Sequence, residues 1–294
     1  MVGQKPSPLS RKEQFTQWLM SMGYIMKLIY QKDQKGARPS SRNLAPVIWP
    51  WILIFVAWTV TLLAVLTKQT FLLNHNYLLT QSHLPWLVAL AVFLVCWQVM
   101  IVSMMLPSSM PLVYIIVHAS RCQQHPRATQ AAFLAGYAFI WTLFAISAFI
   151  GDTLIHWLVS NWFWLYLHSW LIGTVIFAIA GGFQISPFKQ HCLKDNRSPL
   201  SFFEHHFRSG VGSSWHLGLR YGIICLGSCW GLMLIMFGIG VGSIVWMASL
   251  TGMIVVEKTY PGGQRLSYLL GIILLLLAAL WLVHPAWLLA GSGV

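Results

Sequence analysis

Seven apolar stretches divide this chain, and each is close to or above the length that crosses a membrane. A helix needs about 20 predominantly apolar residues to span the hydrocarbon core of a bilayer. Hydrophobic residues make up 57% of the chain and charged residues only 8%, which excludes a soluble globular domain. We therefore predict an all-α fold, a polytopic transmembrane helix bundle of about seven spans. The spans lie near residues 47–66, 86–117, 131–150, 162–183, 217–238, 240–256 and 266–283.

The basic residues indicate the orientation of this bundle. With a cytoplasmic N-terminus, Lys68 is the only one of the 18 basic residues that falls on the outer side. Cytoplasmic loops carry the excess of Lys and Arg in multi-span proteins. We therefore expect the N-terminus in the cytoplasm and the C-terminus outside. The orientation of the bundle in the membrane accounts for the net charge of +12, so this charge does not indicate a nucleic-acid partner. We expect membrane lipid to surround the protein.

The first 46 residues differ in composition from the rest. Apolar side chains between Phe15 and Ile29 recur at helical spacing, which is typical of a helix lying in the cytoplasmic interface, although a helix docked on a partner subunit has the same pattern. We assign residues 1–46 to this amphipathic helix and its linker, and residues 47–294 to the transmembrane helix bundle. No cleaved signal peptide is expected. In the polar segment 184–216, a short helix is predicted from Pro199 to Arg208.

A stripe of sulfur side chains runs along the fifth predicted span. Cys225, Cys229, Met233 and Met236 fall on one face at 3.6 residues per turn. Thiolate and thioether are the ligands that Cu(I) prefers. The stripe therefore predicts a metal site. Cysteine and methionine are also ordinary packing residues of apolar helices, so the spacing alone leaves that alternative open.

The second predicted span carries another sulfur stripe. Cys96, Met100 and Met104 are four residues apart and share a face, whereas Met105 is expected to point elsewhere. In a bundle of alternating spans, Met104 would lie roughly level with Cys229. We therefore predict that the two stripes face each other and supply the metal ligands together.

Other polar groups give weaker signals. Cys192, with its neighbour His191 and with His205 and His206, could form a cytoplasmic point of metal uptake. Asp152 and His156 would share a face if the third span continued that far. The five cysteines are an odd number and do not suggest a disulfide framework. Because phosphate-binding loops, H-E-x-x-H and nucleophile elbows are missing from the sequence, we do not expect an enzyme.

Several motifs in fixed order resemble a bacterial family of predicted metal-binding integral membrane proteins. The resemblance covers about residues 86–283. It rests on Trp97, Met100, Met104, Met105, Pro107 and Pro111; on F-L-A-G-Y from Phe133 with Trp141; on A-G-G-F-Q-I-S-P-F-K-Q-H-C-L from Ala180; on R-S-P-L from Arg197; on C-L-G-S-C-W-G-L-M from Cys225; and on Glu257, Lys258 and the P-G-G that begins at Pro261. It implies a small bundle in the bacterial inner (cytoplasmic) membrane that handles a metal, with copper as the expected ion, and delivers it to an oxidase or another membrane subunit.

The chain departs from that family pattern at two positions. The pattern has cysteines where this chain has Asn196 and Ser228. If metal binds, the candidate ligands are therefore Cys225, Cys229, Met233, Met236, Met100, Met104, Cys96 and Cys192. We expect a protein that binds Cu(I) through these side chains and passes it to a partner. The alternative is a non-catalytic structural or assembly subunit of a membrane complex, in which the sulfur side chains only pack.

Overall fold

The computed structural model describes residues 45–67, 85–120, 123–163, 170–239, 244–260 and 262–283, and the regular elements in these ranges are all helices. The all-α prediction is confirmed. The predicted amphipathic helix before residue 45 lies outside the described residues. The helices are α2 (Ala45–Leu66), α4 (Trp86–Ser120), α5 (Pro126–Asn161), α7 (Trp170–Ile185), α8 (Pro187–Arg197), α9 (Pro199–His206), α10 (Val211–Ile239), α11 (Ile244–Thr259) and α12 (Gly263–Val283).

Five of these helices are long and apolar enough to cross a membrane, or six if the bent pair of α7 and α8 counts as one span, within the ranges described. The sixth predicted span, near residues 240–256, corresponds to α11, which has 16 residues. The short predicted helix is present as α9 and ends at His206 rather than Arg208. Helix α5 continues past Asp152 and His156. The number of spans and the sides of the two termini remain predictions.

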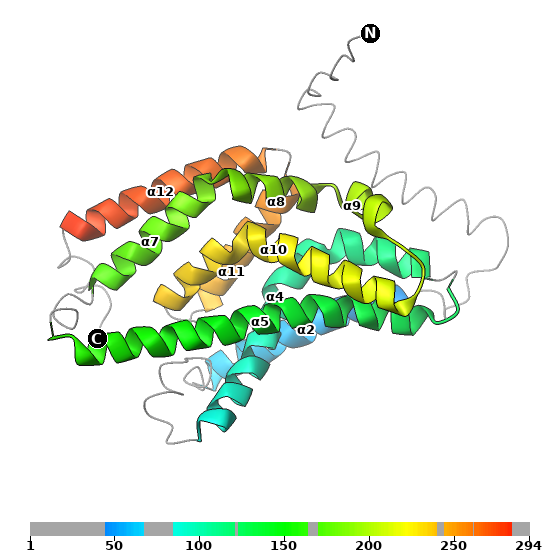
Figure 1. Cartoon of the computed structure of the whole chain (residues 1–294), viewed down its shortest axis with the longest axis horizontal. Helices are drawn as coiled ribbons and strands as arrows, with labels where there is room; N and C mark the ends of the chain where they lie inside the picture. The colour runs from blue at the N-terminus through cyan, green and yellow to red at the C-terminus, as the bar shows by residue number, and fades with distance from the viewer. Residues whose placement is uncertain are drawn as a thin grey trace, which may run out of the picture.

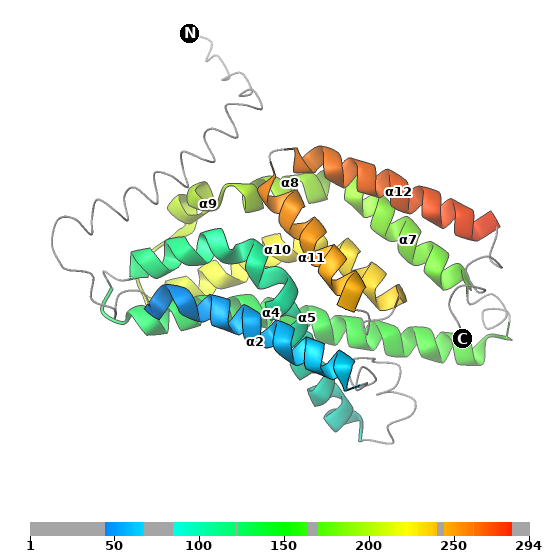
Figure 2. The same ribbon diagram turned by 180° about the vertical axis from the view of Figure 1, so that it is seen from behind.

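Helix α10 lies at the centre of the arrangement (Figures 1 and 2). It packs along α5 and also against α7 and α8, while α7 pairs with α12 at one end of the molecule. Helix α4 packs against α2, α5 and α11. Helices α4 and α10 therefore approach the core from different sides, with α5 and α11 beside both. Large apolar side chains remain exposed along α2 and α12, as suits surfaces that face lipid.

Small residues allow α5 and α10 to lie in close contact. A Cβ atom added at Gly218 on α10 would overlap the carbonyl oxygen of Phe133 on α5, and one added at Gly136 would lie 2.5 Å from the carbonyl oxygen of Trp215. Backbones that approach this closely require glycine, which is the usual way in which membrane helices pack tightly. This pair of glycines fixes the position of α10, which carries the sulfur stripe.

Proline determines how α2 docks on α4. Pro107 has no backbone N–H, so the carbonyl of Ser103, four residues earlier, loses its helical donor. The indole Nε1 of Trp58 on α2 donates to that carbonyl over 3.1 Å. The ribbon of α4 bends near its middle (Figures 1 and 2). The bend and the new donor satisfy a carbonyl that lipid could not satisfy.

A second break separates α7 from α8, whose axes differ by 59°. Ser186 caps α8 by accepting a hydrogen bond from the backbone N–H of Phe188 over 3.2 Å, and Pro187 occupies the first position. A residue before proline avoids the helical region, so α7 ends here. The break turns the polar helix α8 across α10. Helix α8 was not predicted, because the helix expected in the polar segment 184–216 begins at Pro199.

The packing of α5 on α10 gives a first prediction. Gly218→Ala should reduce the free energy of unfolding by roughly 1–3 kcal/mol, because the added methyl group forces the two helices apart. The measurement is thermal unfolding of the purified protein in detergent. Gly182→Ala on α7 is the matched control, since a Cβ atom there meets nothing within 4 Å. Equal stability of the two variants would contradict the close approach.

Candidate metal centre

The sulfur stripe of α10 faces the protein core. Cys225, Cys229, Met233 and Met236 are each at most 1% exposed and belong to one apolar cluster with Met100 and Met104. Cys96 on α4 is half-buried. The structure thus collects most of the predicted ligands in one core, at the centre of the bundle.

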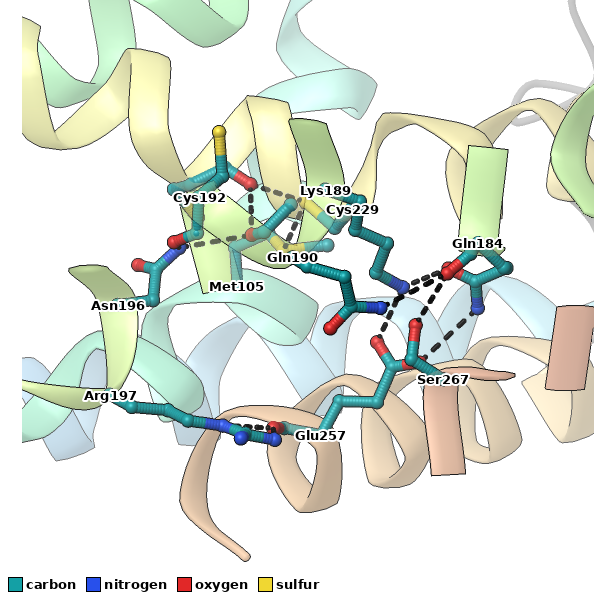
Figure 3. Close-up of polar contacts among 12 residues, drawn as sticks. Met105, Gln184, Lys189, Gln190, Cys192, Asn196, Arg197, Cys229, Glu257 and Ser267 are labelled. Carbon is teal, nitrogen blue, oxygen red and sulfur yellow. Dashed lines mark hydrogen bonds and ion pairs between the residues drawn. The ribbon is translucent and has the colours of Figure 1, made fainter. Parts of the chain in front are cut away.

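A contact between two sulfur atoms joins α10 to α4. The Sγ atom of Cys229 lies 3.7 Å from the Sδ atom of Met105, as Figure 3 shows. We expected Met104 in this place and Met105 pointing elsewhere. Met104 is fully buried, but α4 is rotated so that the next residue reaches Cys229. Helix α4 is bent and packs mainly on α2, α5 and α11, so it does not run alongside α10. The two helices therefore do not form the continuous pair of sulfur stripes that we expected. The long side chain of Met105 reaches from α4 to Cys229 instead.

Cys225 lies one turn before Cys229 and belongs to the same group. The thiol of Cys229 donates to the carbonyl of Cys225 over 2.9 Å. Cys225, Cys229 and Met105 together give the core a set of three buried sulfur atoms, which we call the three-sulfur set.

A lysine and a tyrosine contact the sulfur atom of Cys225. The Nζ atom of Lys258 lies 3.1 Å from it, and the hydroxyl of Tyr137 lies 3.2 Å from it. Lys258 also donates to the hydroxyl of Ser108 on α4 over 3.2 Å and is 5% exposed. A lysine at the end of an apolar helix ordinarily reaches the membrane surface, but Lys258 does not. Its ammonium group is instead part of the sulfur site.

Glu257 takes part in a different network, which Figure 3 shows. Its carboxylate is 2.8 Å from the Nζ atom of Lys189 on α8, and both residues are at most 2% exposed. Gln184 at the end of α7 donates to the same carboxylate over 3.2 Å and accepts a hydrogen bond from Lys189. Arg197 donates to the backbone carbonyl of Glu257 through Nε over 3.0 Å. Helices α7, α8 and α11 are thereby joined by one buried ion pair.

Cys192 on α8 lies on another side of α10. Its Sγ atom would be 2.8 Å from a Cβ atom added at Gly227, which lies on the face of α10 opposite Cys225 and Cys229. Its sulfur atom points away from Cys229 and Met105 in Figure 3. The structure therefore does not bring Cys192 to the other candidate ligands.

The two positions at which the resemblance implies cysteines contact each other. The amide nitrogen of Asn196 on α8 donates to the hydroxyl of Ser228 on α10 over 3.0 Å. The same nitrogen lies 3.2 Å from the carbonyls of Cys192 and Ile224. Asn196 and Ser228 thus form a hydrogen-bonded pair at the contact of α8 with α10.

The histidines do not add a conventional metal cluster. No group of three or more His, Cys, Asp or Glu side chains with metal-binding geometry occurs among the residues that the structure describes. His205 and His206 line a cavity of about 240 Å³ with Asp195 and Ser201, but His191 and Cys192 are not part of its wall. The Nδ1 atom of His205 is 2.7 Å from the carbonyl of Ser201, and that of His206 is 2.9 Å from the carbonyl of Phe202. The predicted cytoplasmic point of uptake is not assembled here.

The three-sulfur set fits a soft monovalent ion. Thiolate and thioether ligands select Cu(I), whereas a magnesium or calcium site needs several oxygen ligands. Sequence reasoning identified Cys225 and Cys229 but missed Met105, Tyr137 and Lys258. The spacing of Met105 from the second stripe argued against it, and the place of Lys258 at a helix end suggested solvent.

A comparison with known protein families gives a match. The family model described as PpoB2, copper chaperone, matches residues 94–281. This range contains every candidate ligand and all the residues of the buried ion pair. No curated protein and no solved structure matches the chain.

The buried ion pair gives a second prediction. Glu257→Gln should lower the free energy of unfolding by roughly 3–5 kcal/mol, because it leaves the ammonium group of Lys189 buried without a countercharge. Thermal unfolding in detergent is the measurement. The double variant Lys189→Met with Glu257→Gln removes both charges and should recover much of the loss. An unchanged stability of the single variant would show that Lys189 reaches water.

Proposed function

Because the chain belongs to the PpoB2 copper chaperone family, we propose that it is a multi-pass membrane protein that binds Cu(I) in its helix core and transfers the ion to a protein partner. The observation that supports this most directly is the 3.7 Å contact between Cys229 and Met105. Metal–sulfur bonds of about 2.3 Å hold neighbouring ligand sulfurs roughly 4 Å apart. The two side chains need only small adjustments to share one ion.

The proposed ligands are Cys225, Cys229 and Met105. The two thiolates supply affinity, and the neutral thioether completes a three-coordinate site of the kind that suits Cu(I). The site is buried among apolar side chains, which excludes water and with it the oxygen ligands that harder ions require. Copper is the cargo in this proposal, so it must also leave.

The remaining methionines offer a route for the ion. Met233 and Met236 continue the stripe of α10 beyond Cys229, and Met100 and Met104 are buried in the same cluster. Thioethers are weak, uncharged ligands, so exchange between successive sulfur atoms needs no charged cavity inside the bilayer. We propose that copper moves along these side chains between the cysteine site and the partner.

The membrane is the proposed place of action. The long apolar helices support a membrane protein, and the family resemblance favours the bacterial inner membrane. A receiving oxidase or another membrane subunit would be the natural partner, because a copper ion held in a bilayer core is most easily passed to a site in the same bilayer. The proposal includes no catalytic step.

A second candidate function follows from one observation. The contact of Asn196 with Ser228 takes the place of two thiols, so this chain has fewer soft ligands than the family pattern. A chain with this change could serve as an assembly subunit whose sulfur side chains only pack. Copper binding by the purified protein distinguishes the two functions.

The test is metal retention. Protein purified with Cu(I) under reducing, anaerobic conditions should carry about one copper ion per chain, held by the sulfur site. Cys229→Ser combined with Met105→Leu should abolish retention, because one ligand remains. The number of copper ions per chain is measured by inductively coupled plasma mass spectrometry after gel filtration.

Met104→Leu is the matched control for Met105→Leu. The two methionines are adjacent and both are fully buried, so the substitutions have similar effects on packing. Cys229→Ser with Met104→Leu should bind copper more weakly than the wild type does, but more tightly than Cys229→Ser with Met105→Leu. Unchanged copper content in Cys229→Ser with Met105→Leu would rule out this site, and a copper-free wild type that still assembles with a membrane complex would favour the second function.

A further inference from the structure

We propose that Lys258 makes the sulfur site selective for charge, so that the site favours monovalent over divalent soft ions. The inference rests on the proposed function, because it concerns the same three ligands. It concerns a residue that would not bind the metal itself. Lys258 is instead the fixed positive charge beside the ligand Cys225, at 3.1 Å from its sulfur atom.

The first step concerns the partners of the buried lysines. Within the described ranges, the carboxylate of Glu257 forms its ion pair with Lys189. Lys258 contacts neutral Ser108 and the sulfur atom of Cys225. Among the described residues, Lys189 and Glu257 therefore neutralise each other, and the group beside Lys258 that can carry a negative charge is the thiol of Cys225.

The second step concerns geometry. Glu257 and Lys258 are consecutive on α11, so their side chains leave the helix about 100° apart. Glu257 points to α7 and α8, as its contacts with Gln184 and Lys189 show, and Lys258 reaches Ser108 on α4 and Cys225 on α10. Arg197 binds the backbone carbonyl of Glu257 and thereby holds this end of α11 in place. The carboxylate cannot approach Lys258 without breaking the ion pair.

The third step is the charge of the loaded site. Two cysteine ligands bind as thiolates and Met105 is neutral, so the ligands contribute two negative charges. With the ammonium group of Lys258, a monovalent ion gives a neutral site and a divalent ion leaves one positive charge. Tyr137 on α5, the other polar neighbour of Cys225, adds no charge as a hydroxyl. An unbalanced charge in a dry core is costly.

The ligands and the lysine therefore exclude different classes of ion. The sulfur atoms exclude hard ions by their chemistry, but Zn(II) and Cd(II) also bind thiolates well. The charge of Lys258 disfavours these divalent ions. Removing it reverses the balance, because two thiolates without the lysine are neutralised by a divalent ion.

The experiment compares Ag(I) with Cd(II), which are both soft and neither of which changes oxidation state during the measurement. Affinities are determined by competition with chelators, using the purified wild type and Lys258→Met in detergent. We expect the wild type to prefer Ag(I), and the ratio of the two affinities to fall by roughly 10- to 100-fold in Lys258→Met. Lys258→Arg keeps the charge and should keep most of the preference.

The double variant Lys189→Met with Glu257→Gln is the control for changes in buried polar groups. It removes one positive and one negative charge together, so the net charge of the core is unchanged and the preference for Ag(I) should stay close to that of the wild type. A loss of preference in this control equal to that in Lys258→Met would overturn the inference, because packing and not charge would then be responsible.

The remaining outcomes are also decisive. A wild type that binds Cd(II) as tightly as Ag(I) overturns the charge inference even if Lys258→Met does not fold. A wild type that prefers Ag(I) while Lys258→Met shows the same ratio overturns it too, and leaves the proposed function intact. A wild type that binds neither ion at its cysteines contradicts the proposed function itself.

Discussion

A charge inside this bundle must find its partner within the protein, and the ion pair of Lys189 with Glu257 meets that requirement. An isolated ion in such a core costs several kcal/mol even after relaxation. The pair joins α8 to α11, and Gln184 extends it to the end of α7, where Ser267 of α12 donates to the carbonyl of Gln184 over 3.0 Å. Four helices thus depend on one pair of charges. The same pair sets the position of α11 and so directs Lys258 to the sulfur site.

Hydropathy was sufficient to locate the apolar helices, because a membrane span needs a minimum length of apolar residues whatever its neighbours are. Helical periodicity was sufficient to place Cys225 and Cys229 on one face. Neither could determine the rotation of α4, which depends on its packing against α2, α5 and α11. This is why Met105 contacts Cys229 where Met104 was expected. A shift of one residue along a helix is a rotation of about 100°.

The polar residues were the harder part. Helix α8 was not predicted because its sequence is polar. Its residues Lys189 and Asn196 are nevertheless buried, since α8 packs against α10 and α11. Lys258 and Glu257 lie at the end of α11, where a charge ordinarily reaches the membrane surface. Their partners are 33 and 68 residues away in the sequence, at Cys225 and Lys189. A single sequence does not indicate which residues so far apart in the chain will contact each other.

The contact between Asn196 and Ser228 has a further consequence for how chains of this kind can diverge. The two side chains lie on different helices and share one hydrogen bond in a tightly packed place, beside Cys192. Exchanging either residue alone removes this bond, but each side chain has a second anchor. The amide nitrogen of Asn196 still meets the carbonyls of Cys192 and Ile224, and the hydroxyl of Ser228 still donates to the carbonyl of Cys225. Positions 196 and 228 can therefore change one at a time, because neither side chain depends on the other alone for its hydrogen bonds.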